Sequence, residues 1–223
     1  YCSIDLFAFL EVLRRKKLIL EIAEIKTLFI QILKGIHYLH CNNIIHRDLK
    51  LTNLLLSKTG EVKICDFGLS RQLEDPDNKN LTKKVVTLWY RSPEILFGEE
   101  YGYKSDMWAL GCIFCEILNE GVPLLPGNSE LNQIELIAGM IGLPSNDFIS
   151  QRSDEAIKAL GRVKVHNGGD LEKRFTSDWS VRGGSRISNV QHVQRNKEYN
   201  ISPSCLDLLK CLLNWDPDKR VSS

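Results

Sequence analysis

No stretch of the sequence is as long and apolar as the ~20 residues that a membrane-spanning helix requires, so we expect no membrane segment. An excess of charge of either sign is also lacking, because 29 lysines and arginines are balanced by 28 aspartates and glutamates, for a net charge of +1. This balance gives no global reason to expect binding to nucleic acid or to a membrane surface. A secretory signal and an initiator methionine are lacking as well, and we therefore expect the 223 residues to begin inside a longer protein.

A disulfide framework is not evident either. The seven cysteines are odd in number and irregular in spacing, which predicts reduced thiols in an intracellular protein. Cys112 and Cys115 have the C-x-x-C spacing of a zinc or redox pair, but they lie in an apolar helical pattern over residues 108–118 without other ligands nearby. We interpret them as buried thiols.

The apolar spacing predicts a mainly helical chain, with one hairpin whose strands, residues 54–56 and 62–65, flank a turn at residues 58–61. There is no alternating β/α pattern and no G-x-x-x-x-G-K-[ST] motif, which excludes a Rossmann or P-loop fold. Residues 72–84 predict a polar surface loop, and residues 146–200 are polar and glycine-rich. Helices are expected over residues 4–13, 22–40, 104–120 (buried nearly all round), 130–141 (capped by Ser129), 154–160 (weak) and 203–213.

Two short motifs carry the chemistry. His46-Arg47-Asp48-Leu49-Lys50-Leu51-Thr52-Asn53 places an acid, an amine and an amide at offsets 0, +2 and +5, and Asp66-Phe67-Gly68 follows the hairpin. Because the motifs flank the hairpin, we expect both acids to reach the same edge of the fold. Phosphoryl transfer needs a carboxylate that orients a hydroxyl, a cation at the γ-phosphate, and oxygen ligands for Mg²⁺. The two motifs in this order predict such a site.

With these motifs the sequence resembles the carboxyl-terminal lobe of a eukaryotic protein kinase, over nearly its whole length. The resemblance implies a mainly α fold, a protein-kinase-like C-terminal lobe with small β-hairpins in the catalytic and activation segments. Residues 1–223 would form one partial kinase domain, from the hinge to helix H and the start of the next helix, with residues 146–200 as a divergent, insert-like region. Further matches are Ser92-Pro93-Glu94 (A-P-E in the family), Asp106-Met107-Trp108-Ala109-Leu110-Gly111-Cys112 and Asp216-Pro217-Asp218-Lys219-Arg220.

More specifically, the sequence resembles cyclin-dependent kinases, and it looks closest to their transcription-linked and PITSLRE-like branch. The segments that carry this are Val85-Val86-Thr87-Leu88-Trp89-Tyr90-Arg91-Ser92-Pro93-Glu94 and Pro123-Leu124-Leu125-Pro126-Gly127-Asn128-Ser129-Glu130. The implied activity is transfer of the ATP γ-phosphate to protein Ser/Thr hydroxyls next to proline. A cyclin-type activator and a location in the nucleus, the cytoplasm or both are implied for the full-length protein.

The resemblance also assigns roles in catalysis. Asp48 would orient the substrate hydroxyl and accept its proton, and Lys50 would meet the γ-phosphate. Asn53 and Asp66 would ligate Mg²⁺, and Thr87 would support Asp48 and Lys50 by hydrogen bonds. For ATP, the backbone of Cys2 would contact adenine, Leu55 would form the floor of the adenine site, and Asp5 would contact the ribose.

Other residues would regulate or support the site. Thr82 matches the activating phosphothreonine, with Arg47 and Arg71 holding its phosphate, because guanidinium groups form charge-assisted hydrogen bonds with a dianion. Val86 and Arg91 would shape a pocket for the substrate proline. Structural roles fall to His46 (packed beneath Asp66-Phe67-Gly68), Asp106 (acceptor for the catalytic loop) and the pair of Glu94 with Arg220.

Several kinase elements are missing from the sequence: the G-x-G-x-x-G loop, the strand lysine of V-A-I-K type and its acidic helix partner. We therefore expect these residues alone to transfer phosphate negligibly. Two other functions stay open. The first is a non-catalytic pseudokinase or docking module, which the intact Asp48, Lys50, Asn53 and Asp66 disfavour. The second is a small-molecule phosphotransferase of kinase-like fold, which Glu94 and Trp89-Tyr90-Arg91 disfavour because they indicate a protein-substrate platform.

Overall fold

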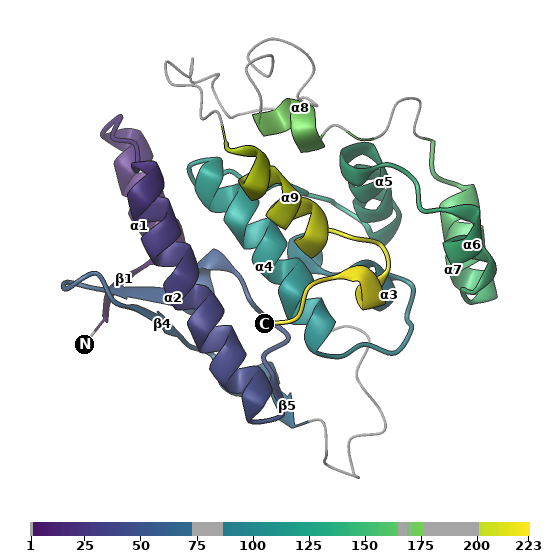
Figure 1. The fold of residues 1–223 in the computed structure, drawn as a ribbon, viewed down its shortest axis with the longest axis horizontal. Helices are drawn as coiled ribbons and strands as arrows, with labels where there is room; N and C mark the ends of the chain where they lie inside the picture. Colours follow the sequence, from purple (N-terminus) through teal and green to yellow (C-terminus); the bar gives the residue numbers. More distant parts are fainter. Residues whose placement is uncertain (1, 73–86, 165–168, 170, 176–200) are drawn as a thin grey trace.

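The computed structural model describes residues 2–72, 87–164, 169, 171–175 and 201–223. The described chain is mainly helical with a few short strands, which confirms the fold class expected from the sequence (Figure 1). In chain order its elements are β1 (Cys2–Asp5), α1 (Leu6–Arg15), α2 (Ile22–Cys41), β2 (Ile44–Ile45), η1 (Leu51–Asn53), β3 (Leu54–Ser57), β4 (Val62–Ile64), η2 (Phe67–Leu69), β5 (Arg71–Gln72), η4 (Leu88–Tyr90), α3 (Pro93–Leu96), α4 (Tyr103–Leu118), α5 (Glu130–Ile141), α6 (Asn146–Ser150), α7 (Asp154–Gly161), α8 (Leu171–Phe175), α9 (Pro203–Leu212) and η6 (Pro217–Lys219).

Helix α4 is the centre of the hydrophobic core. Every residue from Ser105 to Leu118 is buried, as the nearly continuous apolar sequence predicted. Helices α2 and α9 both contact α4, and they flank it in Figure 1. Gly111 permits the close approach of α9's end, because a Cβ there would lie 2.9 Å from Leu213 Cδ2. Helix α4 is therefore held rigidly in the core, and it supports the loops around the site.

The expected first helix begins later than the sequence suggested. Residues 2–5 form strand β1, and Asp5 then caps α1 by accepting a hydrogen bond from Ala8 N at 2.8 Å. The expectation that Ile4 starts the helix is wrong, because Ile4 pairs with Leu56 of β3. Helical spacing alone could not show this, since the partner residue Leu56 lies 52 residues further along the chain.

The expected hairpin is present as β3 and β4, and β1 adds a third strand, giving an antiparallel sheet in the order β1-β3-β4. Strand β2 pairs separately with β5. Helix α2 packs against β4, with Gln31 bonded to Gly60 O at 3.1 Å and to Val62 N at 3.0 Å. The sheet therefore holds the segments before and after the hairpin beside each other.

On the far side of the molecule from this sheet lie α5, α6 and α7, each with a serine as its N-cap (Figure 1). Ser129 caps α5 as predicted, accepting from Asn132 N at 3.2 Å. In residues 146–200 the sequence analysis expected one weak helix, which is α7, but α6 and α8 are also formed. Helix α6 was missed because its five residues give little periodicity, although Ser145 caps it and Phe148 is buried. Residues 165–168, 170 and 176–200 of the predicted insert-like region lie outside the described residues, as does the polar loop after Gln72.

The buried cysteines of α4 bear on the zinc alternative. Cys112 and Cys115 are free thiols and both are buried. Among the described residues no three or more His, Cys, Asp or Glu side chains gather in a way that could hold a metal ion.

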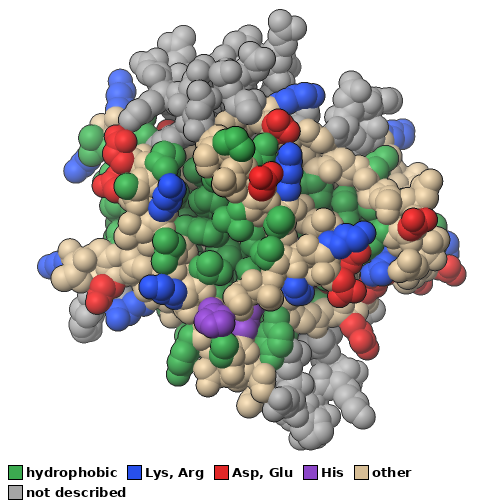
Figure 2. Space-filling view, viewed as in Figure 1, with side chains coloured by type: hydrophobic (Ala, Val, Ile, Leu, Met, Phe, Trp, Pro, Cys, Tyr) green, Lys and Arg blue, Asp and Glu red, His purple; other side chains and the backbone are tan. Residues whose placement is uncertain are grey.

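None of the described helices is long and apolar enough to cross a membrane. On the face in Figure 2, hydrophobic side chains gather in the middle and charges of both signs surround them.

Candidate active site

The loop that carries Asp48 is fixed to α4 through a buried carboxylate. Asp106 accepts hydrogen bonds from the backbone N–H groups of His46 at 2.9 Å and of Arg47 at 3.0 Å. The ring of His40 lies 3.0 Å from the same carboxylate. Arg47 has a φ of 68°, a left-handed conformation that a non-glycine residue adopts only when its surroundings enforce it. Asp106 therefore has the acceptor geometry expected from the sequence.

At the centre of the site, Asp48 contacts three other polar residues directly. Lys50 Nζ donates to Asp48 Oδ2 at 2.6 Å, and Thr87 Oγ1 donates to Asp48 Oδ1 at 3.1 Å. Lys50 Nζ also lies 3.4 Å from Thr87 Oγ1. Asn53 Nδ2 donates to the backbone oxygen of Asp48 at 2.8 Å and to Asp48 Oδ2 at 3.2 Å. Asp48 is thus a buried carboxylate, with its side chain 7% exposed, and it is oriented by three side chains from two segments far apart in the sequence.

The loop that carries Asp66 is bonded to the loop of Asp48 through Cys65, the residue before Asp66. Cys65 N donates to Asn53 O at 2.9 Å, and the His46 ring lies 3.0 Å from Cys65 O. The His46 ring also meets the Phe67 ring edge-on, with centroids 5.2 Å apart. Asp66 itself is exposed and left-handed, with a φ of 64°. The two acids that the sequence separates by the hairpin therefore belong to one edge of the fold, with His46 between their loops.

The oxygen donors in the site suit Mg²⁺. Asn53 uses its amide nitrogen for Asp48, which leaves its amide oxygen as the atom for a cation. Asp66 supplies an exposed carboxylate from the neighbouring loop. Magnesium prefers such oxygen ligands and is commonly held by one or two carboxylates together with substrate phosphates. The residues that are present therefore fit the ion that the sequence analysis assigned to them.

The residues assigned to ATP lie on adjacent strands. In the pairing of β1 with β3, Asp5 is opposite Leu55 and Cys2 is opposite Ser57. Leu55 is half-buried and follows Asn53 by two residues, so the proposed adenine floor is continuous with the proposed metal ligand. Asp5 Oδ1 is occupied as the cap of α1, which fixes that carboxylate in position.

The regulatory residues are described only in part. Arg47 is buried, donating from Nη1 to Tyr101 Oη at 3.0 Å and from Nε to Leu69 O. Arg71 is exposed on β5, opposite Ile45. Arg91 Nη1 donates to Glu130 Oε1 of α5 at 3.0 Å. Thr82 and Val86, the proposed phosphosite and the other half of the proline pocket, lie outside the described residues.

A buried hydrogen bond below the site was missed by the sequence analysis. Tyr90 Oη donates to Glu116 Oε2 of α4 at 2.6 Å. Burial raises the pKa of Glu116 to about 7, while the Tyr90 hydrogen bond lowers it. Burial and the nearby carboxylate raise the pKa of Tyr90 well above its usual value, and burial likewise raises that of Cys112. A glutamate inside an apolar helix was the signal in the sequence, because a buried carboxylate requires a hydrogen-bond partner.

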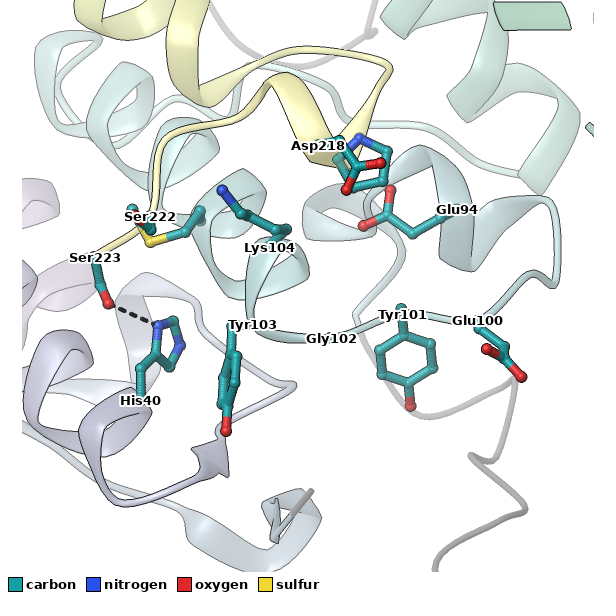
Figure 3. Close-up of a pocket in the computed structure, with 12 residues that line it drawn as sticks. His40, Glu94, Glu100, Tyr101, Gly102, Tyr103, Lys104, Asp218, Ser222 and Ser223 are labelled. Carbon is teal, nitrogen blue, oxygen red and sulfur yellow. Dashed lines mark hydrogen bonds between the residues drawn. The ribbon is translucent and has the colours of Figure 1, made fainter. Parts of the chain in front are cut away.

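A cavity of about 470 Å³ lies elsewhere, beside the start of α4 (Figure 3). His40, Tyr101, Tyr103, Lys104 and Asp218 are among its lining residues, and His40 is bonded to Ser223 there at 3.0 Å. The central cluster around Asp48 is not part of its lining. The candidate active site is therefore the open edge formed by the two loops and not this cavity.

Comparison with known proteins agrees with this geometry. The profile of the protein kinase domain matches residues 1–223. Cyclin-dependent kinase G-1 of Oryza sativa subsp. indica is 42% identical over 205 residues, covering 90% of this chain and 27% of the relative. Cyclin-dependent kinase 10 of Mus musculus is 40% identical over 208 residues, covering 93% of this chain and 56% of the relative. A chain of the yeast RNA Pol II CTD kinase CTDK-1 complex superposes with a TM-score of 0.80 at 31% identity, covering 100% of this chain and 65% of that one.

The chain therefore belongs to the protein kinase family. Within that family it is similar to cyclin-dependent kinases, in agreement with the resemblance carried by the segment that ends at Glu94. It spans well under two thirds of the length of the rice and mouse relatives.

Proposed function

We propose that this chain is the catalytic lobe of a Ser/Thr protein kinase that transfers the ATP γ-phosphate to protein hydroxyls followed by proline. The observation that carries the proposal is the contact of Asp48 with Lys50, Asn53 and Thr87. A fixed, nearly buried carboxylate beside an ammonium group is suited to orient a hydroxyl and to accept its proton.

The remaining residues divide the work of transfer. Lys50 holds a positive charge next to Asp48, where it would balance the negative charge on the transferred phosphoryl group. Asn53 and Asp66 would hold Mg²⁺, which supplies charge neutralisation at the phosphate oxygens when it is bound. Thr87 bonds to Oδ1 of Asp48 and Asn53 bonds to Oδ2, so both carboxylate oxygens are held by hydrogen bonds. Cys2, Asp5 and Leu55 would position the nucleotide.

The finer assignments are also proposals. Arg91 is held by Glu130 at the edge of the segment after Thr87, which supports its role with Val86 in accepting a proline. Phosphorylated Thr82 would be held by Arg47 and Arg71. A cyclin-type partner would activate the full-length protein, as the names of the relatives suggest. We place the protein inside the cell, in the nucleus, the cytoplasm or both. Free thiols are present at Cys41, Cys65, Cys112, Cys115, Cys205 and Cys211, in keeping with that location.

Residues 1–223 alone should have negligible activity. The sequence contains no glycine-rich phosphate loop and no strand lysine of the kind that positions ATP in kinases. Positioning supplies much of the rate enhancement in phosphoryl transfer, so half of the cleft should not suffice. Turnover of ATP and a Ser-Pro peptide by these residues alone at an ordinary kinase rate, ~1–100 per second, would contradict this.

The decisive experiment is Asp48→Asn in the full-length protein. We expect kcat for a Ser-Pro peptide to fall by about 10²–10⁴-fold, while Mg·ATP binding persists, because the variant loses the proton acceptor and keeps the fold. Asp207→Asn, at an exposed position of α9, is the matched control and should retain full activity. Unchanged turnover in Asp48→Asn would reject the assigned role and favour the docking-module alternative.

A further inference from the structure

The segment after Thr87 is held on three sides. Thr87 bonds to Asp48 in the catalytic loop, and Tyr90 bonds to Glu116 in α4. The third support is α5, which contacts η4 and was given no role by the sequence analysis beyond the core. Because this segment carries Arg91, its contacts with α5 affect how the proposed proline pocket would recognise a substrate.

The support from α5 is a closed ring of hydrogen bonds around Gln133. Gln133 Oε1 accepts from Gly127 N at 3.0 Å, and its Nε2 donates to Trp89 O at 3.4 Å. Trp89 Nε1 in turn donates to Gly127 O at 2.9 Å. Gln133 is 0% exposed, and a fully buried amide persists only where its donor and acceptor are both satisfied.

The ring has a strict steric requirement at Gly127. A Cβ on this residue would lie 2.2 Å from Gln133 Oε1 and 3.0 Å from the Gln133 backbone. Any larger residue would displace the amide that holds Trp89. Glycine is therefore needed here for close approach and not for a special φ angle.

The same turn of α5 also holds Arg91. Glu130, three residues before Gln133, accepts from Arg91 Nη1 at 3.0 Å. The side chain of Arg91 is 13% exposed and that of Glu130 is 58% exposed, so the pair lies at the surface while Gln133 anchors the helix below it. The first turn of α5 thus fixes the backbone at Trp89 and the guanidinium two residues later.

We infer that Gln133 is a positioning residue for substrate selectivity, which through Trp89 and Gly127 sets the location of Arg91 and hence the preference for proline after the target hydroxyl. The inference rests on the proposed function, since it names what sets the specificity of that site. Glutamine is required because it both donates and accepts. Methionine offers neither group, and glutamate would keep only the acceptor for Gly127 N.

The test is Gln133→Met in the full-length kinase with its activator. The readout is the ratio of kcat/KM for a Ser-Pro peptide to that for the matching Ser-Ala peptide. We expect the ratio to fall by about tenfold, which lies within the range for losing two neutral hydrogen bonds. The change should appear in the KM of the Ser-Pro peptide, while the KM of ATP stays unaltered. Gln31→Met is the matched control, because Gln31 also bridges two backbone groups but does so at the β3–β4 hairpin. Its ratio should equal that of the wild type.

The outcomes separate the inference from the function on which it rests. Equal losses for both peptides in Gln133→Met, with the ratio unchanged, would show a merely structural role and overturn the inference alone. A wild-type protein that transfers no phosphate, or that shows no preference for proline, would reject the proposed function and the inference together. If Gln133→Met does not fold, the ratio in Gln133→Glu decides, because that variant still loses the bond to Trp89 O.

Discussion

Arg220 and Glu94, which are 126 residues apart in the sequence, form a buried bidentate ion pair. Nη1 donates to Oε1 at 2.7 Å and Nη2 donates to Oε2 at 2.6 Å. Arg220 also donates to the backbone oxygens of Asn214, Lys104 and Trp215, and it lies 5.2 Å from the centre of the Trp108 ring. The pair therefore ties α3, which follows the substrate segment, to the end of the described chain and to α4.

Removal of one partner should be costly. Arg220→Met leaves the Glu94 carboxylate buried without its cation, and we expect the free energy of unfolding to fall by about 3–5 kcal/mol. Lys219→Met is the matched control, because Lys219 is exposed and its pairing with Asp216 is at the surface. That variant should lie within about 0.5 kcal/mol of the wild type in chemical denaturation. Equal denaturation midpoints for both variants would show that the ion pair contributes little.

The resemblance to the protein kinase family implied this pair, because both partners lie in motifs of that family. The contacts within the catalytic loop could also be predicted, because its residues are adjacent in sequence. The burial of α4 could be predicted too, because a nearly continuous apolar helix must lie in the core. Tyr90 with Glu116 and Gln133 with Trp89 were not predicted, since no local pattern says which buried polar groups will meet. Strand β1 was missed for a related reason: pairing of Ile4 with a distant strand overrode the helical spacing.

Thr87 offers a test of how Asp48 is oriented. Its hydroxyl donates to Asp48 Oδ1 at 3.1 Å and lies 3.4 Å from Lys50 Nζ. Thr87→Val keeps the shape of the side chain and removes the hydroxyl. We expect kcat to fall by about tenfold, because one hydrogen bond to a charged group is lost. The KM of ATP should change little. Thr87→Ser retains the hydroxyl and should remain near wild-type activity. If steady-state kinetics give the same kcat for the two variants, the hydroxyl does not orient the acid.

Ser92 offers a substitution expected to stabilise the fold. Its Oγ is buried and has no hydrogen-bond partner among the described residues, although Ser92 precedes the first turn of α3 as its N-cap. Ser92→Ala removes an unsatisfied buried hydroxyl and loses no capping bond, so we expect a gain of about 1 kcal/mol in the free energy of unfolding. Ser145 is the contrasting position, since its Oγ accepts from Phe148 N at 3.3 Å as the cap of α6. Ser145→Ala should lose about 1 kcal/mol. Denaturation curves that shift in the same direction for both would contradict this account.

Thr82 tests the proposed regulation. Thr82→Ala removes the hydroxyl that would be phosphorylated, and a phosphate dianion held by Arg47 and Arg71 would order the segment before Thr87. We expect the activity of the phosphorylated wild type to exceed that of Thr82→Ala by about tenfold or more, with equal thermal denaturation, since the residue is not part of the predicted core. Thr59→Ala, on the exposed hairpin turn, should leave activity unchanged. Equal activity of wild type and Thr82→Ala would remove Thr82 from the mechanism.

Glu116 predicts a pH dependence of stability with a definite sign. Burial raises its pKa from 4.5 to about 7, so in the folded protein the carboxyl stays protonated to a higher pH than in the unfolded chain. The folded state therefore binds more protons between these two values. The stability that Glu116 contributes is therefore complete below about pH 4.5. It is lost as the pH rises towards 7, and this loss amounts to roughly 3 kcal/mol at most. The substitution Glu116→Gln keeps an oxygen that accepts from Tyr90 Oη but carries no charge at any pH. We expect urea denaturation of the wild type to show a lower free energy of unfolding at pH 8 than at pH 5 by a margin that the variant lacks. The histidines are present in both proteins, so the difference between the two pH profiles reports on Glu116 alone. Parallel profiles would mean that the Glu116 carboxyl is already ionised at pH 5 in the folded protein.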